Sequence, residues 1–284
     1  MTPITAFTTS HAKGDIPVDT RRDTALVTGA SSGIGAAYAE RLASLGWDTV
    51  LVARRAQRLD DLARRLREGT GTAVETLVAD LSDPGDLAGV ARRAAGDDIG
   101  FLLNNAGING YGPFAGLEPE LMTKILDVNV LAVTALTRAA VPAMLERGRG
   151  TLVNVASQLA FAGALPPGPL PERAVYGGTK GYVVTFTRTL AAELAGTPLR
   201  IQVLCPGLTA TEFHRSRGDA PVPGREQAVH EDGGMPVDQV VDASLAALDT
   251  GEVVCVPGLE DPAPVDGLAE AELAIRTAAR RGGS

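Results

Sequence analysis

Cysteine and aromatic side chains are both scarce in this sequence. The 284 residues include two cysteines, Cys205 and Cys255, and both lie within apolar, strand-like runs. A secreted scaffold held together by disulfides would have more cysteines, placed in polar loops. We therefore interpret the two as buried, reduced thiols and expect a cytoplasmic protein. Aromatic residues make up only 4% of the chain, which argues against a surface on which nucleic-acid bases stack.

Long apolar segments and basic stretches are also lacking. No apolar run approaches the roughly 18 residues needed to cross a bilayer. Residues 1–22 contain no apolar core of the signal-peptide type, so we interpret them as a flexible polar leader. The 26 basic and 34 acidic residues give a net charge of −8, without a Lys/Arg stripe that could follow a phosphate backbone. We expect no nucleic-acid partner, no membrane partner and no metal site.

What the sequence does contain is an alternation of strand-like and helix-like segments. Apolar residues make up 45% of the chain, which is ordinary for a globular protein. Strands separated by helices need crossover connections, which favours a parallel sheet. We predict a doubly wound α/β Rossmann fold with a mostly parallel seven-stranded sheet, helices on both faces, and a single domain over residues 23–284. The expected strands are Thr24–Thr28, Thr49–Ala53, Val74–Ala79, Phe101–Leu103, Thr151–Val155, Ile201–Leu204 and Val253–Val256.

Six helices are expected between these strands, and two long loops interrupt the pattern. The helices are predicted over 34–45, 56–68, 84–95, 119–147, 175–195 and 237–248. The loops cover about 158–173, which includes a proline-rich insertion at 164–173, and about 212–236. Both follow strand ends at the edge of the sheet where doubly wound folds bind ligands. We therefore expect the two loops to contact the substrate.

A glycine-rich turn, Thr28–Gly35, follows the first expected strand and opens the first helix. Gly29 allows a sharp turn, Gly33 allows the backbone to approach a pyrophosphate, and Gly35 allows the helix to pack close to the sheet. Free N–H groups at the helix start favour an anion. Because this strand–turn–helix context is met, we interpret the turn as a nucleotide-binding site and not only as a tight turn.

The residues after the second expected strand indicate which cofactor is bound. An NAD site would have a carboxylate here for the ribose hydroxyls, whereas this chain has Ala53 followed by Arg54 and Arg55. A guanidinium can bind a 2′-phosphate through two hydrogen bonds. We predict NADP(H), with Arg54 favoured as the phosphate ligand. Arg55 could equally be a solvated charge at the helix start.

Tyr176 and Lys180 are four residues apart on one predicted helix, so both side chains lie on the same face. A phenol has a pKa of about 10, which a nearby ammonium group lowers. We therefore expect Lys180 to lower the pKa of Tyr176. Ser157 ends a buried strand, where its hydroxyl could meet a carbonyl oxygen, and Asn129 lies inside a helix, where an amide is unfavourable unless it is used.

Taken in order, these motifs resemble the classical branch of the short-chain dehydrogenase/reductase family, over about Thr24 to Pro257. The resemblance implies that Tyr176 is the general acid in reduction, that Ser157 polarises the carbonyl oxygen, and that Lys180 binds the nicotinamide ribose. It also implies that Asn129 holds a water that links Lys180 to solvent. The cofactor-binding residues that it implies are Gly29, Ser31, Ser32, Gly33, Ile34, Gly35, Arg54, Arg55, Asp80, Leu81, Asn105, Ala106, Gly107, Tyr176, Lys180, Pro206, Gly207, Thr209 and Thr211.

The function that follows is reduction of a ketone or aldehyde by NADPH. The alternatives are oxidation of a secondary alcohol by the same residues and a non-catalytic NADP(H)-sensing protein. Ser157 and Tyr176 are 19 residues apart, several more than is usual for the family, and the proline-rich insertion accounts for the difference. Apolar residues in the insertion suggest a medium-sized, partly apolar carbonyl substrate. The resemblance also implies a homodimer or homotetramer built through the helices near 119–147 and 175–195.

Overall fold

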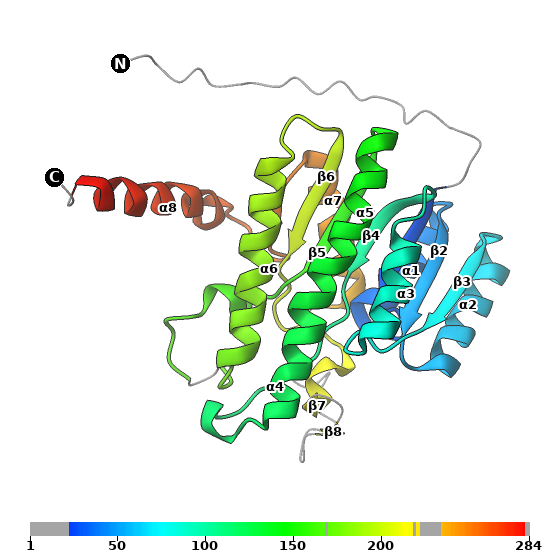
Figure 1. The fold of residues 1–284 in the computed structure, drawn as a ribbon, viewed down its shortest axis with the longest axis horizontal. Coiled ribbons are helices and arrows are strands. Elements are labelled where there is room, and N and C mark those ends of the chain that lie inside the picture. The colour runs from blue at the N-terminus through cyan, green and yellow to red at the C-terminus, as the bar shows by residue number, and fades with distance from the viewer. Residues whose placement is uncertain (1–22, 168–169, 218–219, 222–233, 282–284) are drawn as a thin grey trace.

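The computed structural model describes residues 23–167, 170–217, 220–221 and 234–281. The predicted leader, residues 1–22, lies outside this part of the chain, as does most of the predicted loop at 212–236. Figure 1 shows a twisted sheet with helices on both sides.

Seven parallel strands form the large sheet, in the order β3-β2-β1-β4-β5-β6-β9. The order reverses direction between β1 and β4, which is the switch point where doubly wound folds bind ligands. This confirms the predicted Rossmann fold. The strands are β1 (Thr24–Thr28), β2 (Asp48–Ala53), β3 (Val74–Val78), β4 (Ile99–Asn104), β5 (Gly150–Val155), β6 (Leu199–Leu204) and β9 (Val254–Cys255). A separate antiparallel pair consists of β7 (Ser216–Arg217) and β8 (Ala220–Pro221).

Helices cover the two faces of the sheet and enclose two main apolar clusters. On one face, α1 contacts α2 and α7, and Tyr38 of α1 packs with Val27 and Leu51. On the other, α3 contacts α5, and Leu136 of α5 packs with Leu26 and Leu102. The helices are α1 (Gly33–Ser44), α2 (Ala56–Thr70), α3 (Pro84–Ala94), α4 (Pro119–Leu126), α5 (Val133–Arg147), α6 (Ala174–Glu193), α7 (Val237–Thr250) and α8 (Ala263–Arg281).

The single helix predicted over 119–147 is interrupted in the structure. A π-helical turn, η2 (Asp127–Ala132), separates α4 from α5. Such turns shift the hydrogen-bond pattern by one residue and recur at functional sites. The stretch Pro119–Arg147 is 29 residues long with a mean hydropathy of 1.6 in its most apolar window. By length and composition the stretch could cross a membrane, although charged and polar residues interrupt its apolar runs. In the structure 44% of that window is buried, and α5 contacts β4 and β5 of the sheet.

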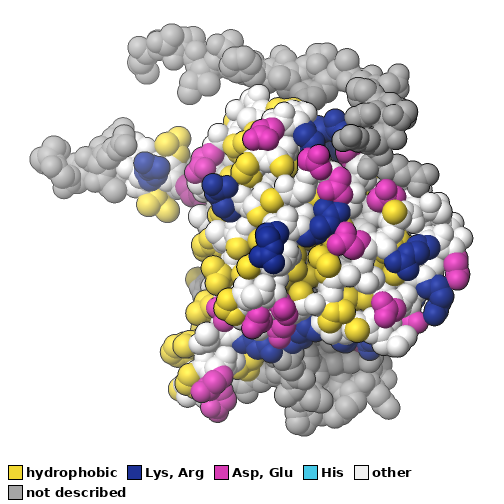
Figure 2. All heavy atoms as spheres, turned by 45° about the vertical axis from the view of Figure 1, so that its right-hand side comes forward, with side chains coloured by type: hydrophobic (Ala, Val, Ile, Leu, Met, Phe, Trp, Pro, Cys, Tyr) yellow, Lys and Arg dark blue, Asp and Glu magenta, His cyan; other side chains and the backbone are white. Residues whose placement is uncertain are grey.

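Three short 3-10 helices and the helix α8 have no counterpart in the sequence-based prediction. The 3-10 helices are η1 (Phe114–Gly116), η3 (Gln158–Phe161) and η4 (Glu212–Arg215). Helix α8 extends away from the sheet (Figure 1), and Leu273 and Ile275 on it are 66% and 71% exposed. On the face shown in Figure 2, Lys and Arg side chains are interspersed with Asp and Glu.

Candidate active site

The glycine-rich turn between β1 and α1 has the shape expected of a nucleotide cradle. Gly29 and Gly33 adopt φ values of +68° and +56°, which side-chain-bearing residues rarely adopt. A Cβ atom on Gly35 would lie 2.4 Å from the carbonyl oxygen of Gly29. A Cβ atom on Gly33 would lie 3.0 Å from the Thr211 side chain, which follows β6. The turn therefore leaves its backbone N–H groups close to the switch point, and the residues present fit a dinucleotide.

The hydroxyl of Thr28 joins this turn to the end of β4. It donates to the carbonyl oxygen of Leu103 at 3.2 Å and accepts from the N–H groups of Asn105 and Ala106, both at 3.0 Å. The side chain of Asn105 donates back to the Thr28 carbonyl at 3.0 Å. The two cofactor-binding segments predicted from the sequence are thus held together. Thr28 itself was not among the predicted site residues.

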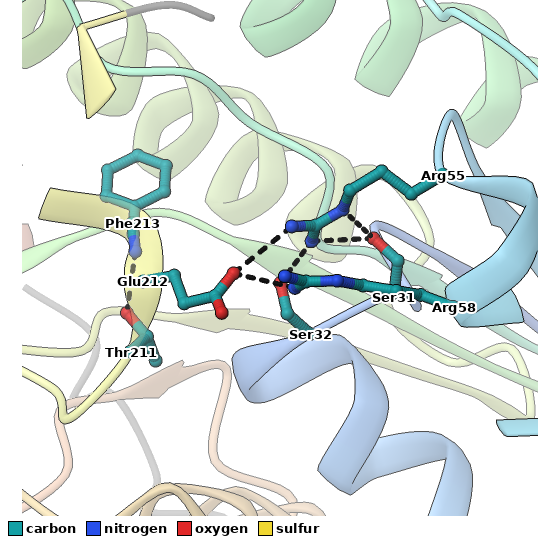
Figure 3. Close-up of polar contacts among 7 residues, drawn as sticks. All are labelled: Ser31, Ser32, Arg55, Arg58, Thr211, Glu212 and Phe213. Atoms are coloured by element: carbon teal, nitrogen blue, oxygen red, sulfur yellow. Dashed lines mark hydrogen bonds and ion pairs between the residues drawn. The ribbon is translucent and has the colours of Figure 1, made fainter. Parts of the chain in front are cut away.

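The two arginines after β2 take different partners. Arg55 donates to the hydroxyls of Ser31 and Ser32, at 2.8 and 2.6 Å (Figure 3). Arg54 lies 4.0 Å from the carboxylate of Asp80, beyond ordinary hydrogen-bond distance. Sequence analysis favoured Arg54 over Arg55, yet it is Arg55 that lies across the glycine-rich turn.

Asp80, one of the cofactor-binding residues that the resemblance implies, lies in a partly cationic environment. Burial alone would raise its pKa, but hydrogen bonds from Ser82 and the charges of Lys124 and Arg54 lower the pKa overall. The carboxylate is therefore ionised at neutral pH, as an acceptor of hydrogen bonds from an adenine amino group should be. Leu81 beside it is buried.

Tyr176 lies at the centre of an aromatic cluster near the start of α6. Its ring centroid is 5.2 Å from that of Tyr111 and 5.9 Å from that of Phe213. The side chain is buried, and the hydroxyls of Ser157 and Tyr111 lie close enough to influence its pKa. Tyr111 and Phe213 were not predicted, because neither belongs to a local motif.

Burial dominates the acidity of the catalytic candidates. It raises the pKa of Tyr176 well above the ordinary value, Tyr111 adds to the increase, and the hydrogen bond from Ser157 only partly offsets it. The expectation that the pKa of Tyr176 is lowered was therefore wrong for the protein without cofactor. Burial also lowers the pKa of Lys180, to about 8. Its ammonium lies 5.7 Å from the Tyr176 ring centroid and donates to the Val155 carbonyl at 2.8 Å.

Asn129 lies in the π-helical turn, and both the nitrogen and the oxygen of its side-chain amide make hydrogen bonds. The amide nitrogen donates to the Ile108 carbonyl at 2.9 Å and to the Thr179 hydroxyl at 3.1 Å, and the amide oxygen accepts from the Ile108 N–H at 3.0 Å. A Cβ atom on Gly107 would lie 3.4 Å from this amide oxygen and 3.5 Å from the ammonium nitrogen of Lys180. Both groups therefore face the same glycine.

The segment after β6 lies next to the catalytic candidates. The Gln158 N–H donates to the Pro206 carbonyl at 2.9 Å, and a Cβ atom on Gly207 would lie 2.8 Å from the Gln158 side chain. The hydroxyl of Thr209 donates to the Gly207 carbonyl at 3.1 Å. These contacts connect the segment to the residue after Ser157; the binding of the cofactor by Pro206, Gly207, Thr209 and Thr211 stays a prediction.

The proline-rich insertion is held by one buried guanidinium. Arg173, which precedes α6, donates to the carbonyl oxygens of Ala162, Leu165 and Pro171, at 2.5, 2.9 and 2.9 Å. One side chain thus binds both ends of the described part of the insertion, directly before the helix of Tyr176.

A nucleotide cradle beside a Tyr/Ser/Lys cluster, with the tyrosine and the lysine buried, defines the class of NAD(P)-dependent oxidoreductases that act on CH–OH or carbonyl groups. The family of short chain dehydrogenases matches residues 23–221. The chain belongs to this family.

Several relatives have names that describe reductases. The chain is 33% identical over 208 residues to very-long-chain 3-oxoacyl-CoA reductase-A of Danio rerio, covering 71% of this chain and 63% of that protein. It is 36% identical over 217 residues to a Streptomyces violaceoruber protein named as ketoacyl reductase 1 of the granaticin polyketide synthase, covering 74% and 75%. The match therefore spans less than two thirds of the Danio reductase.

Solved structures agree over more of the chain. A short-chain dehydrogenase from Sphingobium yanoikuyae in complex with NADPH has a TM-score of 0.80 at 39% identity, covering 90% of this chain and 95% of that one. A bulky-bulky ketone specific alcohol dehydrogenase from Comamonas testosteroni has a TM-score of 0.78 at 33% identity, covering 90% and 94%.

Proposed function

We propose that the protein reduces a ketone or aldehyde to an alcohol with NADPH. The observation that carries the proposal is the position of Tyr176: a buried phenol on the helix that also carries Lys180, whose ammonium lies 5.7 Å from its ring centroid. The chemistry that the cofactor supplies when bound is transfer of a hydride from its nicotinamide ring. The side chains of the chain supply the proton and the polar groups around it.

Tyr176 is the proton donor. Burial keeps the pKa of its hydroxyl above the ordinary value, so the phenol is protonated at neutral pH, as reduction requires. Ser157 hydrogen-bonds to the carbonyl oxygen as negative charge develops on it. Oxidation of an alcohol uses the opposite form of Tyr176, the phenolate, so the same residues can act in both directions. The names of the relatives, which describe reductases, favour reduction over oxidation.

Lys180 and Asn129 support the proton donor. With a pKa of about 8, Lys180 is largely charged at neutral pH and can stabilise the phenolate left after proton transfer. It also binds the ribose of the nicotinamide half. Asn129 fixes the backbone of Ile108 and the hydroxyl of Thr179, and we propose that it holds a water that links Lys180 to solvent, a relay through which the phenolate of Tyr176 recovers its proton.

The 2′-phosphate of the cofactor is bound by the arginines after β2. Two guanidinium groups and no carboxylate follow this strand, and an NADPH complex of a 39% identical structure is consistent with that choice. Replacing Arg54 by Ala should weaken NADPH binding at least tenfold while NADH binding changes less, because a charge-assisted phosphate contact contributes about 1.5–3 kcal/mol. Titration calorimetry with both cofactors measures this. Equal losses for the two would contradict the assignment.

The substrate is a medium-sized, partly apolar carbonyl compound. Tyr111 and Phe213 flank the proton donor, and the apolar insertion held by Arg173 leads into its helix. The names of the relatives, a ketoacyl reductase and a bulky-bulky ketone specific dehydrogenase, describe carbonyl compounds of this kind. A panel of ketones, assayed by the loss of NADPH absorbance, tests the proposal. Turnover of small sugars, without turnover of apolar ketones, would contradict it.

We also propose that two or four copies associate through α5 and α6. Leu131 in the π-helical turn is 53% exposed, Leu145 on α5 and Tyr182 on α6 are each 37% exposed, and Tyr182 borders a shallow apolar hollow with Phe186 and Leu190. Light scattering after gel filtration measures the assembly, and a monomer at micromolar concentration would contradict this. The location in the cytoplasm stays a prediction.

A further inference from the structure

Glu212 connects the segment after β6 to the arginines after β2. It begins η4, and its carboxylate accepts hydrogen bonds from Arg58 at 2.7 Å and from Arg55 at 3.1 Å. Figure 3 shows the carboxylate facing both guanidinium groups, while Arg55 also lies on the two serines of the glycine-rich turn. A negative charge from a distant part of the chain thus lies beside Arg55, a predicted cofactor-binding residue, and beside Arg58, which the sequence analysis did not single out.

A carboxylate and a phosphate compete for the same donors. Both accept paired hydrogen bonds from the planar fork of a guanidinium. The N–H groups that Arg55 and Arg58 give to Glu212 are therefore not available to a second anion. Two negative charges at this position would also repel each other.

The contact is weak enough to be exchanged. Glu212, Arg55 and Arg58 are 42%, 45% and 46% exposed in their side chains. Ion pairs with this exposure are worth little, because water screens them. Hydrogen bonds from Arg58 and, more weakly, from Arg55 lower the pKa of Glu212, so the competing charge is present at neutral pH.

We propose that Glu212 is a specificity-determining residue that competes with the 2′-phosphate of NADP(H) for Arg55 and Arg58. In the free protein it holds the two guanidinium groups in place. It releases them when the phosphate binds. The inference rests on the proposed use of NADPH and adds that the affinity for NADPH is lowered by a residue of the substrate-side segment.

Glu212 is followed in the chain by a residue of the catalytic site. Phe213 packs its ring against Tyr176, and its carbonyl accepts a hydrogen bond from Asn109 at 2.7 Å. The segment that carries the competing carboxylate therefore also contacts the proposed proton donor.

The test compares the wild type with Glu212→Gln, which keeps the size of the side chain and removes its charge. The matched control is Glu272→Gln on α8. It breaks an ion pair with Arg188, at 2.6 Å, and removes the same charge, but α8 lies on the other side of the molecule from α2 (Figure 1). Calorimetric titrations use NADPH, NADH, adenosine 2′,5′-bisphosphate and AMP. The last two ligands differ by the 2′-phosphate and contain no nicotinamide.

Glu212→Gln should bind NADPH and the bisphosphate about three- to tenfold more tightly, the range expected when two exposed ion pairs no longer compete. The affinities of Glu212→Gln for NADH and AMP should change by less than about twofold. The affinities of Glu272→Gln for all four ligands should also change by less than about twofold. Unchanged or weaker binding of the bisphosphate to Glu212→Gln would overturn the role of Glu212 but not the proposed use of NADPH. A wild-type protein that binds NADH but not NADPH would overturn the proposed cofactor as well.

Discussion

Replacing Tyr176 by Phe removes one oxygen atom from the centre of the proposed mechanism. A positioned general acid contributes about 10²–10⁴-fold to a rate, so turnover should fall by that factor, which corresponds to about 3–5 kcal/mol in activation free energy. The binding of NADPH should stay within about twofold, because the glycine-rich turn and its arginines are unchanged.

The cost of this substitution to folding should be small. The neighbouring hydroxyls that influence Tyr176, those of Ser157 and Tyr111, belong to residues that are only half-buried. They can bond to water after the substitution, so the loss should be about 1 kcal/mol. For a domain of this size that lowers Tm by about 2–4 °C. A much larger decrease would mean that lost activity reflects unfolding.

Tyr182→Phe is the matched control for Tyr176→Phe. Tyr182 lies on the same helix, and its hydroxyl also makes a hydrogen bond, with Thr134 at 2.9 Å. The two variants lose the same atom, but only one loses the proposed proton donor. Steady-state turnover, NADPH titration and thermal unfolding should be measured for both. If Tyr176→Phe retains the activity of Tyr182→Phe, the assignment of the proton donor is refuted.

Three further predictions concern folding. Between pH 8 and pH 10, the unfolding free energy of the wild type relative to Lys180→Met should rise by about 2 kcal/mol. The reason is that the pKa of Lys180 falls from 10.5 to about 8 on folding, so its charge favours the unfolded state until the amine is neutral in both states. A difference in unfolding free energy that does not change with pH in urea titrations would contradict this. Asn129→Ala should cost about 2–4 kcal/mol, measured in the same way, since it leaves the buried backbone groups of Ile108 without partners. Gly35→Ala should lower the unfolding free energy by about 1–3 kcal/mol and abolish NADPH binding, because the added carbon would meet the carbonyl oxygen of Gly29. Gly181→Ala is the control: the position has open space around it, so the substitution should stabilise the protein by up to about 1 kcal/mol.

Elements with a local pattern could be predicted from the sequence. The strand–turn–helix around Gly29 and the alternation of apolar strands specify the Rossmann fold, because each signal lies within a few residues. The interruption at Asp127–Ala132 could not be read in this way, since the apolar pattern runs through it without a break. Helix α8 was missed because most of its residues are exposed and give no core-facing stripe.

Parts of the site that depend on distant contacts could not be predicted. Arg55 and Glu212 are 157 residues apart in the chain, and no spacing rule connects them. The choice between Arg54 and Arg55 depends on side-chain direction, which the sequence leaves open. The pKa of Tyr176 was misjudged because the sequence shows a lysine one turn away but not the degree of burial, and burial has the larger effect.

The hydrogen bonds of Arg173 to Ala162, Leu165 and Pro171 have a consequence for how the substrate range can change. The described ends of the insertion are hydrogen-bonded to the same guanidinium. The chain between them can therefore be lengthened, shortened or exchanged while the strand before Ser157 and the helix of Tyr176 keep their positions. Lengthening such a closed loop costs little entropy. The insertion is therefore a suitable place for engineering. Replacing the sequence between these anchor points should alter which carbonyl compounds are accepted and leave the proposed catalytic residues in place.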